Sequence, residues 1–161
     1  MRHAVILALL AGVFPALPLA QAPTALQGAW QVVEVTTPGP AGSTNSNPQP
    51  GLYLFTARHY SIISILSPEP RPPFKDPNNV SGEEALAIWT PLQAQSGTYE
   101  VVGGSLNLLP LVAKNPGVMR TGRKPDVYAV TVQGNSLTLV QKGDGIGQLA
   151  NPTTLRLKRL D

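Results

Sequence analysis

The sequence predicts an all-β protein, an eight-stranded antiparallel up-and-down β-barrel with one short helix. Eight segments rich in β-branched and aromatic residues follow one another along the chain, mostly joined by short turns. The chain has 17 prolines and 15 glycines but only 13% charged residues, a composition that favours turns over long helices. A sandwich of two antiparallel sheets is the main alternative. Closure into a barrel would remove the exposed strand edges that invite aggregation.

The first 22 residues have the features of a secretory signal peptide. A positively charged start is followed by an apolar stretch over residues 4–19, and small residues stand at Ala20 and Ala22. The apolar stretch is shorter than the roughly 20 residues of a membrane-spanning helix, and prolines interrupt it. We therefore expect a signal peptide over residues 1–22 and one barrel domain over residues 23–161, with no integral membrane span after signal removal.

The absence of cysteine bears on where the mature protein works. Without cysteine the chain has no lipid attachment site and no disulfide. Together with the export signal, this predicts a soluble periplasmic or secreted protein.

Three strands are predicted in the first half of the domain, over residues 29–37, 52–56 and 59–66. The stretch between the first two, residues 38–50, is polar and rich in proline and glycine, so we expect a surface loop. The short link Ala57-Arg58 between the second and third suits a tight hairpin.

A proline-rich stretch and one helix follow. Residues 67–79 contain five prolines, which can hold neither a strand ladder nor a helix, so this stretch is expected to run over the surface. Ser81 and Glu84 have the spacing of a capping box, and a helix is predicted over residues 83–95, with Pro91 expected to shorten it. A lid or an excursion beside the sheet would both fit.

Five more strands are predicted, over residues 98–102, 105–109, 127–133, 136–142 and 153–160. Gly103-Gly104 and Gly134-Asn135 separate two pairs of them and permit the positive φ angles of two-residue hairpin turns. In the last strand, alternation puts Leu155, Leu157 and Arg159 on one face. A barrel of eight strands has room inside for side chains or for one small ligand.

Several short motifs, by their order and spacing, resemble the bacterial lipocalin-like domain family over nearly all of the domain. These are Gly28-Ala29-Trp30, the run from Gly51 to Thr56 with His59-Tyr60-Ser61, Gly97-Thr98-Tyr99, the hairpin from Gly134 to Leu139, and a terminal strand ending in Arg159. The resemblance implies that Trp30 packs across a closed end of the barrel with Arg159 lying over it. Such a cation–π contact would contribute roughly 0.5–2 kcal/mol and would be structural.

The sequence lacks the usual catalytic, metal-binding and cofactor motifs. After the signal peptide His59 is the only histidine, and we interpret it as an ordinary turn residue, so no metal site is predicted. No phosphate loop, dinucleotide fingerprint or nucleophile elbow occurs, and no cofactor is predicted. The net charge of +3 comes without a basic stripe carrying aromatic residues, which argues against nucleic-acid binding.

Glu34 is the only residue carried forward as a catalytic candidate, and no other catalytic residue is predicted. Alternation with Trp30 and Val32 would turn it into the barrel, where burial would raise its carboxyl pKa and suit acid–base chemistry. The opposite register, with Glu34 in water, is at least as good an interpretation. Glu100 carries the same ambiguity.

Four tyrosines and one arginine are the candidate ligand-binding residues. Any tyrosine that faces inward offers a ligand an apolar ring and a hydroxyl, although packing alone also explains aromatic residues on strands. The basic loop over residues 113–125 could attract an acidic group, and the family resemblance favours Arg120 within it. The candidates are Tyr53, Tyr60, Tyr99, Tyr128 and Arg120.

These observations lead to one main functional hypothesis and two alternatives. The main hypothesis is a secreted lipocalin-like protein that binds a small, mostly apolar ligand, with or without a carboxylate, in the barrel cavity. One alternative is an acid–base enzyme that acts on a hydrophobic substrate in that cavity. The other is an envelope protein that acts through its surface or proline-rich loops.

Overall fold

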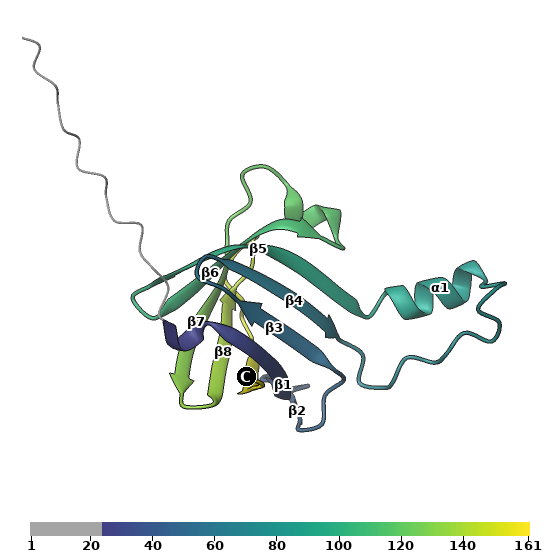
Figure 1. Ribbon diagram of the computed structural model, residues 1–161, viewed down its shortest axis with the longest axis horizontal. Helices are drawn as coiled ribbons and strands as arrows, with labels where there is room; N and C mark the ends of the chain where they lie inside the picture. Colours follow the sequence, from purple (N-terminus) through teal and green to yellow (C-terminus); the bar gives the residue numbers. More distant parts are fainter. Residues whose placement is uncertain (1–23) are drawn as a thin grey trace, which may run out of the picture.

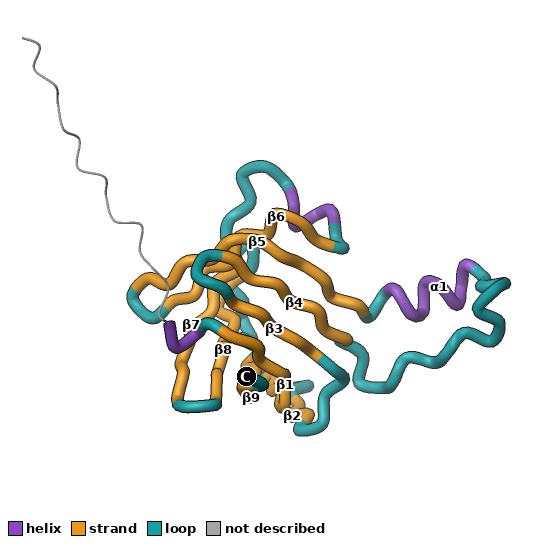
Figure 2. Tube along the Cα trace, viewed as in Figure 1, coloured by secondary structure: helices purple, strands orange, loops and turns teal. Residues whose placement is uncertain are grey.

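A computed structural model describes residues 24–161, which form a closed antiparallel barrel (Figures 1 and 2). The strands pair in the order β2-β1-β3-β4-β5-β6-β7-β8-β9, and β1 also pairs with β9, which closes the sheet. The strands are β1 (Gly28–Thr37), β2 (Ser43–Asn45), β3 (Gly51–Phe55), β4 (His59–Ile65), β5 (Leu92–Val102), β6 (Ser105–Ala113), β7 (Asp126–Gln133), β8 (Ser136–Gly143) and β9 (Thr154–Arg159).

The predicted eight-stranded up-and-down barrel is confirmed. The ninth strand, β2, pairs only with the last residues of β1, so the barrel itself consists of β1 and β3–β9. Because the sheet closes on itself, the two-sheet sandwich is excluded. The predicted signal peptide lies outside the described residues.

The largest difference from the sequence prediction is the boundary between helix and strand. The helix α1 spans Gly82–Trp89, six residues shorter than predicted at its C-terminal end, and β5 begins at Leu92 instead of residue 98. Thr90 caps the helix and Pro91 follows it. Residues 92–98 then pair along the whole of β4, and this distant partner stabilises an extended strand that no local signal indicates. The strand β2 inside the predicted loop also depends on a distant partner, the end of β1.

Helix α1 begins with the predicted capping box. The Ser81 hydroxyl accepts a hydrogen bond from the Glu84 amide at 3.2 Å, and the Glu84 carboxylate accepts one from the Ser81 amide at 3.2 Å. The Ser81 hydroxyl also donates to the Glu84 carboxylate, and the two hydrogen bonds from Ser81 hold the pKa of the Glu84 carboxyl below its usual value. The helix buries none of its residues and projects from the barrel beyond β4 and β5 (Figure 1). The predicted excursion is therefore a surface element.

Within residues 24–161, no helix has the length and apolar character needed to cross a membrane.

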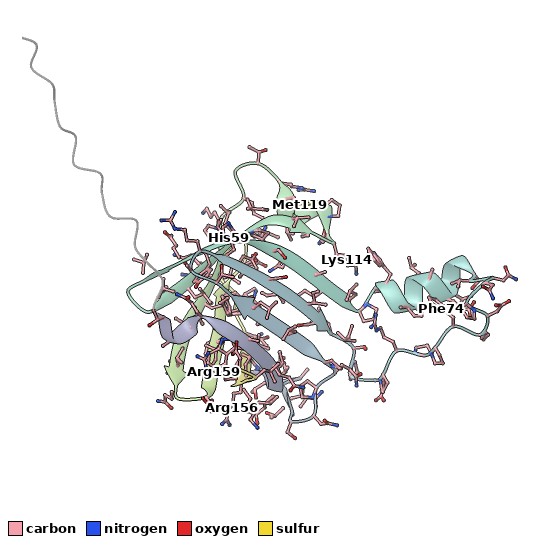
Figure 3. The ribbon with its side chains drawn as sticks, viewed as in Figure 1. His59, Phe74, Lys114, Met119, Arg156 and Arg159 are labelled. Atoms are coloured by element: carbon pink, nitrogen blue, oxygen red, sulfur yellow. The ribbon has the colours of Figure 1, made fainter. Side chains whose placement is uncertain are left out.

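The closed end of the barrel is plugged by Trp30. The indole is fully buried and its Nε1 donates a hydrogen bond to the Leu26 carbonyl at 2.9 Å. Leu26 ends the short 3₁₀ helix η1 (Thr24–Leu26), which lies next to this end. The Arg159 guanidinium lies 4.1 Å from the indole centroid and donates to the carbonyls of Gln27 and Ala25 (Figure 3). The predicted inward direction of Arg159 is confirmed.

The plug requires glycine at position 28. Gly28 has a φ of 129°, and a Cβ there would lie 2.5 Å from the Arg159 Nη1. The half of the barrel next to the plug is filled by buried apolar side chains, namely Phe55, Leu106, Leu108, Leu137 and Leu157. Any internal space must therefore lie at the other end.

Candidate functional site

A cavity of about 510 Å³ opens at the end of the barrel opposite Trp30. Its wall combines apolar and polar side chains from most strands of the barrel and from the loops around its mouth. Residues at the wall include Val35, Tyr53, Gln93, Gln95, Arg123, Asp126, Tyr128, Gln141, Asp144, Thr153 and Leu155.

A β-bulge in β1 decides which side chains of that strand reach the cavity. The register against β9 shifts between Val32 and Glu34, so that Val35 pairs with Leu155 and lines the cavity. Glu34 pairs instead with Arg156 on the outer side, and the two side chains form an ion pair of 3.6 Å. The structure thus places Glu34 outside the barrel. Glu100 is also exposed, and it accepts a hydrogen bond from Asn107.

The four predicted tyrosines all point into the barrel but at different depths. Tyr53 and Tyr128 line the cavity. Tyr60 is only 2% exposed, and its hydroxyl has no hydrogen-bond partner among the described residues. Tyr99 lies in the filled half, where its hydroxyl donates to the Thr56 carbonyl at 2.6 Å and its ring meets Phe55 edge to face. The structure therefore brings Tyr53, Tyr60 and Tyr128 together and leaves Tyr99 in the packed core.

An ion pair stands at the cavity wall. Asp126 begins β7, on the same inward face as Tyr128, and its Oδ1 lies 2.7 Å from the Arg123 Nη2. Both side chains are nearly buried, with 7% and 12% of their surfaces exposed. The same oxygen accepts a hydrogen bond from the Gly145 amide at 3.1 Å. Asp126 thus connects the loop before β7 to the loop after β8 at the mouth of the barrel.

The local sequence explains how Arg123 reaches this position. It follows the 3₁₀ helix η2 (Pro116–Met119) in the connection from β6 to β7, and its guanidinium lies against Gly145. A side chain at Gly145 would overlap the guanidinium, so glycine is needed there. Arg120, the predicted arginine of this loop, is exposed and does not line the cavity. It borders a neighbouring depression together with Gly122 and Ile146.

Sequence reasoning missed Asp126 and Gln95, and it did not single out Arg123. A signal for Asp126 was present, because alternation along β7 puts it on the same face as Tyr128. Gln95 had no such signal, since it falls in the part of β5 that was predicted as helix. His59, as expected, lies exposed at the turn between β3 and β4 (Figure 3). Among residues 24–161, no three histidine, aspartate or glutamate side chains gather to form a possible metal site.

Burial governs the ionisation of the interior tyrosines. It raises the pKa of Tyr53 to about 12 and the pKa of Tyr60 further. It also raises the pKa of Tyr128 well above its ordinary value, and the charges of Tyr53 and Asp126 add to the effect. These phenols stay neutral at physiological pH, in an interior that disfavours negative charge.

We expect the protein to lose stability at high pH because of these tyrosines. Each has a folded-state pKa above its unfolded value, so its contribution to stability is complete below the ordinary pKa of 10.0 and declines as the pH rises towards 12. Urea unfolding at a series of pH values should show this decline, and the Tyr53→Phe variant should show a shallower one. Stability that stays constant across this range would contradict the burial of the phenols.

The fold and the cavity define a class of protein, a closed up-and-down β-barrel with one plugged end and one open internal site. No protein-family model matches the chain, and no curated protein matches it. Among solved structures, the chain is similar to the crystal structure of a lipocalin-like protein from Bacteroides uniformis, with 15% sequence identity and a TM-score of 0.49. That alignment covers 84% of this chain and 99% of the other. Strand order and closure, which are independent of this comparison, establish the predicted all-β class, an eight-stranded antiparallel up-and-down barrel.

Proposed function

We propose that this protein binds a small amphipathic molecule in the open end of the barrel, after export to the periplasm or out of the cell. The cavity of about 510 Å³ carries the proposal. It falls within the range of roughly 300–1,000 Å³ that small-molecule sites occupy. Export rests on the signal-like residues 1–22.

The character of the cavity wall supports an amphipathic ligand over a purely apolar one. Val35 and Leu155 supply aliphatic surface and Tyr53 an aromatic ring, on which an apolar body would pack. The glutamines Gln93, Gln95 and Gln141 supply amide groups from β5 and β8. A fully apolar ligand would leave these amides without hydrogen bonds, at an energetic cost. The outward position of Glu34 gives no support to acid–base catalysis in the cavity.

Blocking the cavity should abolish binding. N-phenyl-1-naphthylamine, a neutral fluorescent probe with an apolar body and one N–H group, should bind to the wild-type protein with an increase in fluorescence. Thr153 lines the cavity directly before β9, so the Thr153→Trp variant would place an indole in this space. We expect its affinity for the probe to be at least about tenfold weaker, a change of about 1.4 kcal/mol.

The matched control is the same substitution on the outer face of the barrel. Thr131 lies on β7 and is exposed, so Thr131→Trp should bind the probe as the wild type does. The proposal is contradicted if the wild type shows no probe binding, or if Thr153→Trp binds it unchanged. Native mass spectrometry of protein purified from its own host would complement this test by revealing a retained small molecule.

A further inference from the structure

The charged side chains at the cavity wall leave an excess of negative charge. Asp126 and Asp144 are acidic, whereas Arg123 is the only basic residue that lines the cavity within residues 24–161. The Asp144 carboxylate accepts hydrogen bonds from the amides of Ile146 and Gly147 at 2.9 and 3.1 Å, and these hold its pKa below the usual value. Asp144 is therefore expected to be ionised at neutral pH, while Asp126 forms an ion pair with Arg123, so the wall has one acidic side chain more than it has basic ones.

The single cation of the cavity is already engaged. The Arg123 Nη2 is paired with Asp126, and its Nη1 donates to the Lys124 carbonyl at 3.3 Å. A carboxylate ligand would have to compete with Asp126 for this guanidinium in a nearly buried place. Separating a buried ion pair leaves an uncompensated charge, which is costly. The described residues of this wall thus give a carboxylate ligand no unpaired cation.

One oxygen of Asp126 is free to accept a hydrogen bond from a ligand. Both hydrogen bonds that Asp126 accepts end on Oδ1, and no donor from residues 24–161 reaches Oδ2. The side chain is 93% buried, since only 7% of its surface is exposed, and it borders the cavity. The Oδ2 atom is therefore an acceptor that a donor bound in the cavity can use. The buried Tyr60 hydroxyl also lacks a partner among the described residues.

The tyrosines that line the cavity with Asp126 also favour a positively charged ligand. Tyr53 and Tyr128 line the cavity, and the electron-rich face of an aromatic ring attracts cations.

From this arrangement we infer that the ligand of the cavity is an organic amine, whose protonated N–H group donates to the free Oδ2 of Asp126 while its apolar part packs against the barrel wall. This inference rests on the proposed function and assigns the ligand's chemical class. The amine takes the place of the acidic ligand group that the basic loop suggested. Arg123, the arginine that reaches the cavity, is already paired with Asp126.

A series of probes with one chain and three head groups tests the inference. Decylamine, decanol and decanoate share a ten-carbon chain, and their affinities can be measured by isothermal titration calorimetry at neutral pH. We expect decylamine to bind at least about tenfold more tightly than decanoate, with decanol between them, because hydrogen bonds between ionised partners are the stronger ones. Equal affinities, or a preference for decanoate, would overturn the inference but leave the proposed cavity function intact. Binding of none of these probes, nor of N-phenyl-1-naphthylamine, would overturn the proposed function itself.

Two variants should shift this preference in opposite directions. Asp126→Asn removes the accepting charge and frees Arg123, so decylamine should lose about tenfold in affinity and decanoate should gain. Arg123→Gln leaves the carboxylate without its partner, so decylamine should gain and decanoate should lose. If circular dichroism shows that one of these two variants is unfolded, the affinity ratio of the other variant tests the role of Asp126. Asp161→Asn, the same substitution near the plugged end, should leave the ratio unchanged. An unchanged ratio in the folded cavity variants would refute the role of Asp126.

Discussion

Replacing Trp30 with alanine is expected to lower the free energy of unfolding by roughly 3–5 kcal/mol, the range for removing a buried tryptophan or phenylalanine side chain. The indole has no exposed surface, and it lies beneath the Arg159 guanidinium at 4.1 Å. Its loss would create a cavity at the closed end and remove both the cation–π contact and the hydrogen bond to Leu26. Since small domains are stable by only about 5–15 kcal/mol, this change removes a large share of the total.

Urea unfolding followed by far-ultraviolet circular dichroism measures this loss. The chain offers a matched control, because its other tryptophan, Trp89, is 54% exposed on α1. Its ring contacts Lys114 at 5.4 Å, so Trp89→Ala should cost less than about 1 kcal/mol. Equal losses from the two substitutions would show that Trp30 does not plug the barrel.

Replacing Gly97 with alanine should also destabilise the barrel strongly, by about 3 kcal/mol, near the upper end of the usual range for overpacked sites. Gly97 pairs with Pro110 of β6, next to a β-bulge in which Leu111 of β6 is the extra residue. An added Cβ would overlap the backbone carbonyl oxygen of Leu109, which no side-chain rotation can relieve. The strand pair β5–β6 would have to separate locally, at a sharp bend of the barrel wall.

The control for Gly97→Ala is the same substitution at Gly147. A Cβ at Gly147 would meet no atom within 4 Å, so Gly147→Ala should leave the urea midpoint nearly unchanged. If Gly97→Ala lowers the free energy of unfolding by less than about 1 kcal/mol, β5 and β6 do not approach each other as closely at the bulge as the structure shows.

Much of the fold was predictable because the signals are local. The glycine turns at 103–104 and 134–135, the alternation in β9 and the Ser81–Glu84 capping box each depend on a few neighbouring residues. The plug of Trp30 and Arg159 was predictable from the family resemblance together with alternation. The start of β5 was not, since residues 92–97 become a strand only by pairing with β4.

The candidate site was only partly predictable for the same reason. The sequence named the four tyrosines as candidates but left open which of them face inward. It also could not show that Tyr99 would find a partner in the Thr56 carbonyl, in the filled half. Alternation also left both sides of β1 open for Glu34, and the bulge in β1 decides for the outer side. The loop between β6 and β7 has several basic residues. Only the folded structure shows that Arg123 lines the cavity and that Arg120 does not.

The sequence by itself determined the fold class and the number of barrel strands, because turn chemistry and side-chain alternation act over a few neighbouring residues. The residues of the plug came from the family resemblance, with alternation in support. Tertiary structure decided where the open space lies and which charges face it. That decision depends on strand register, on one bulge in β1 and on two loops that meet at Asp126. Each of these joins segments distant in the chain, and no local pattern records such contacts.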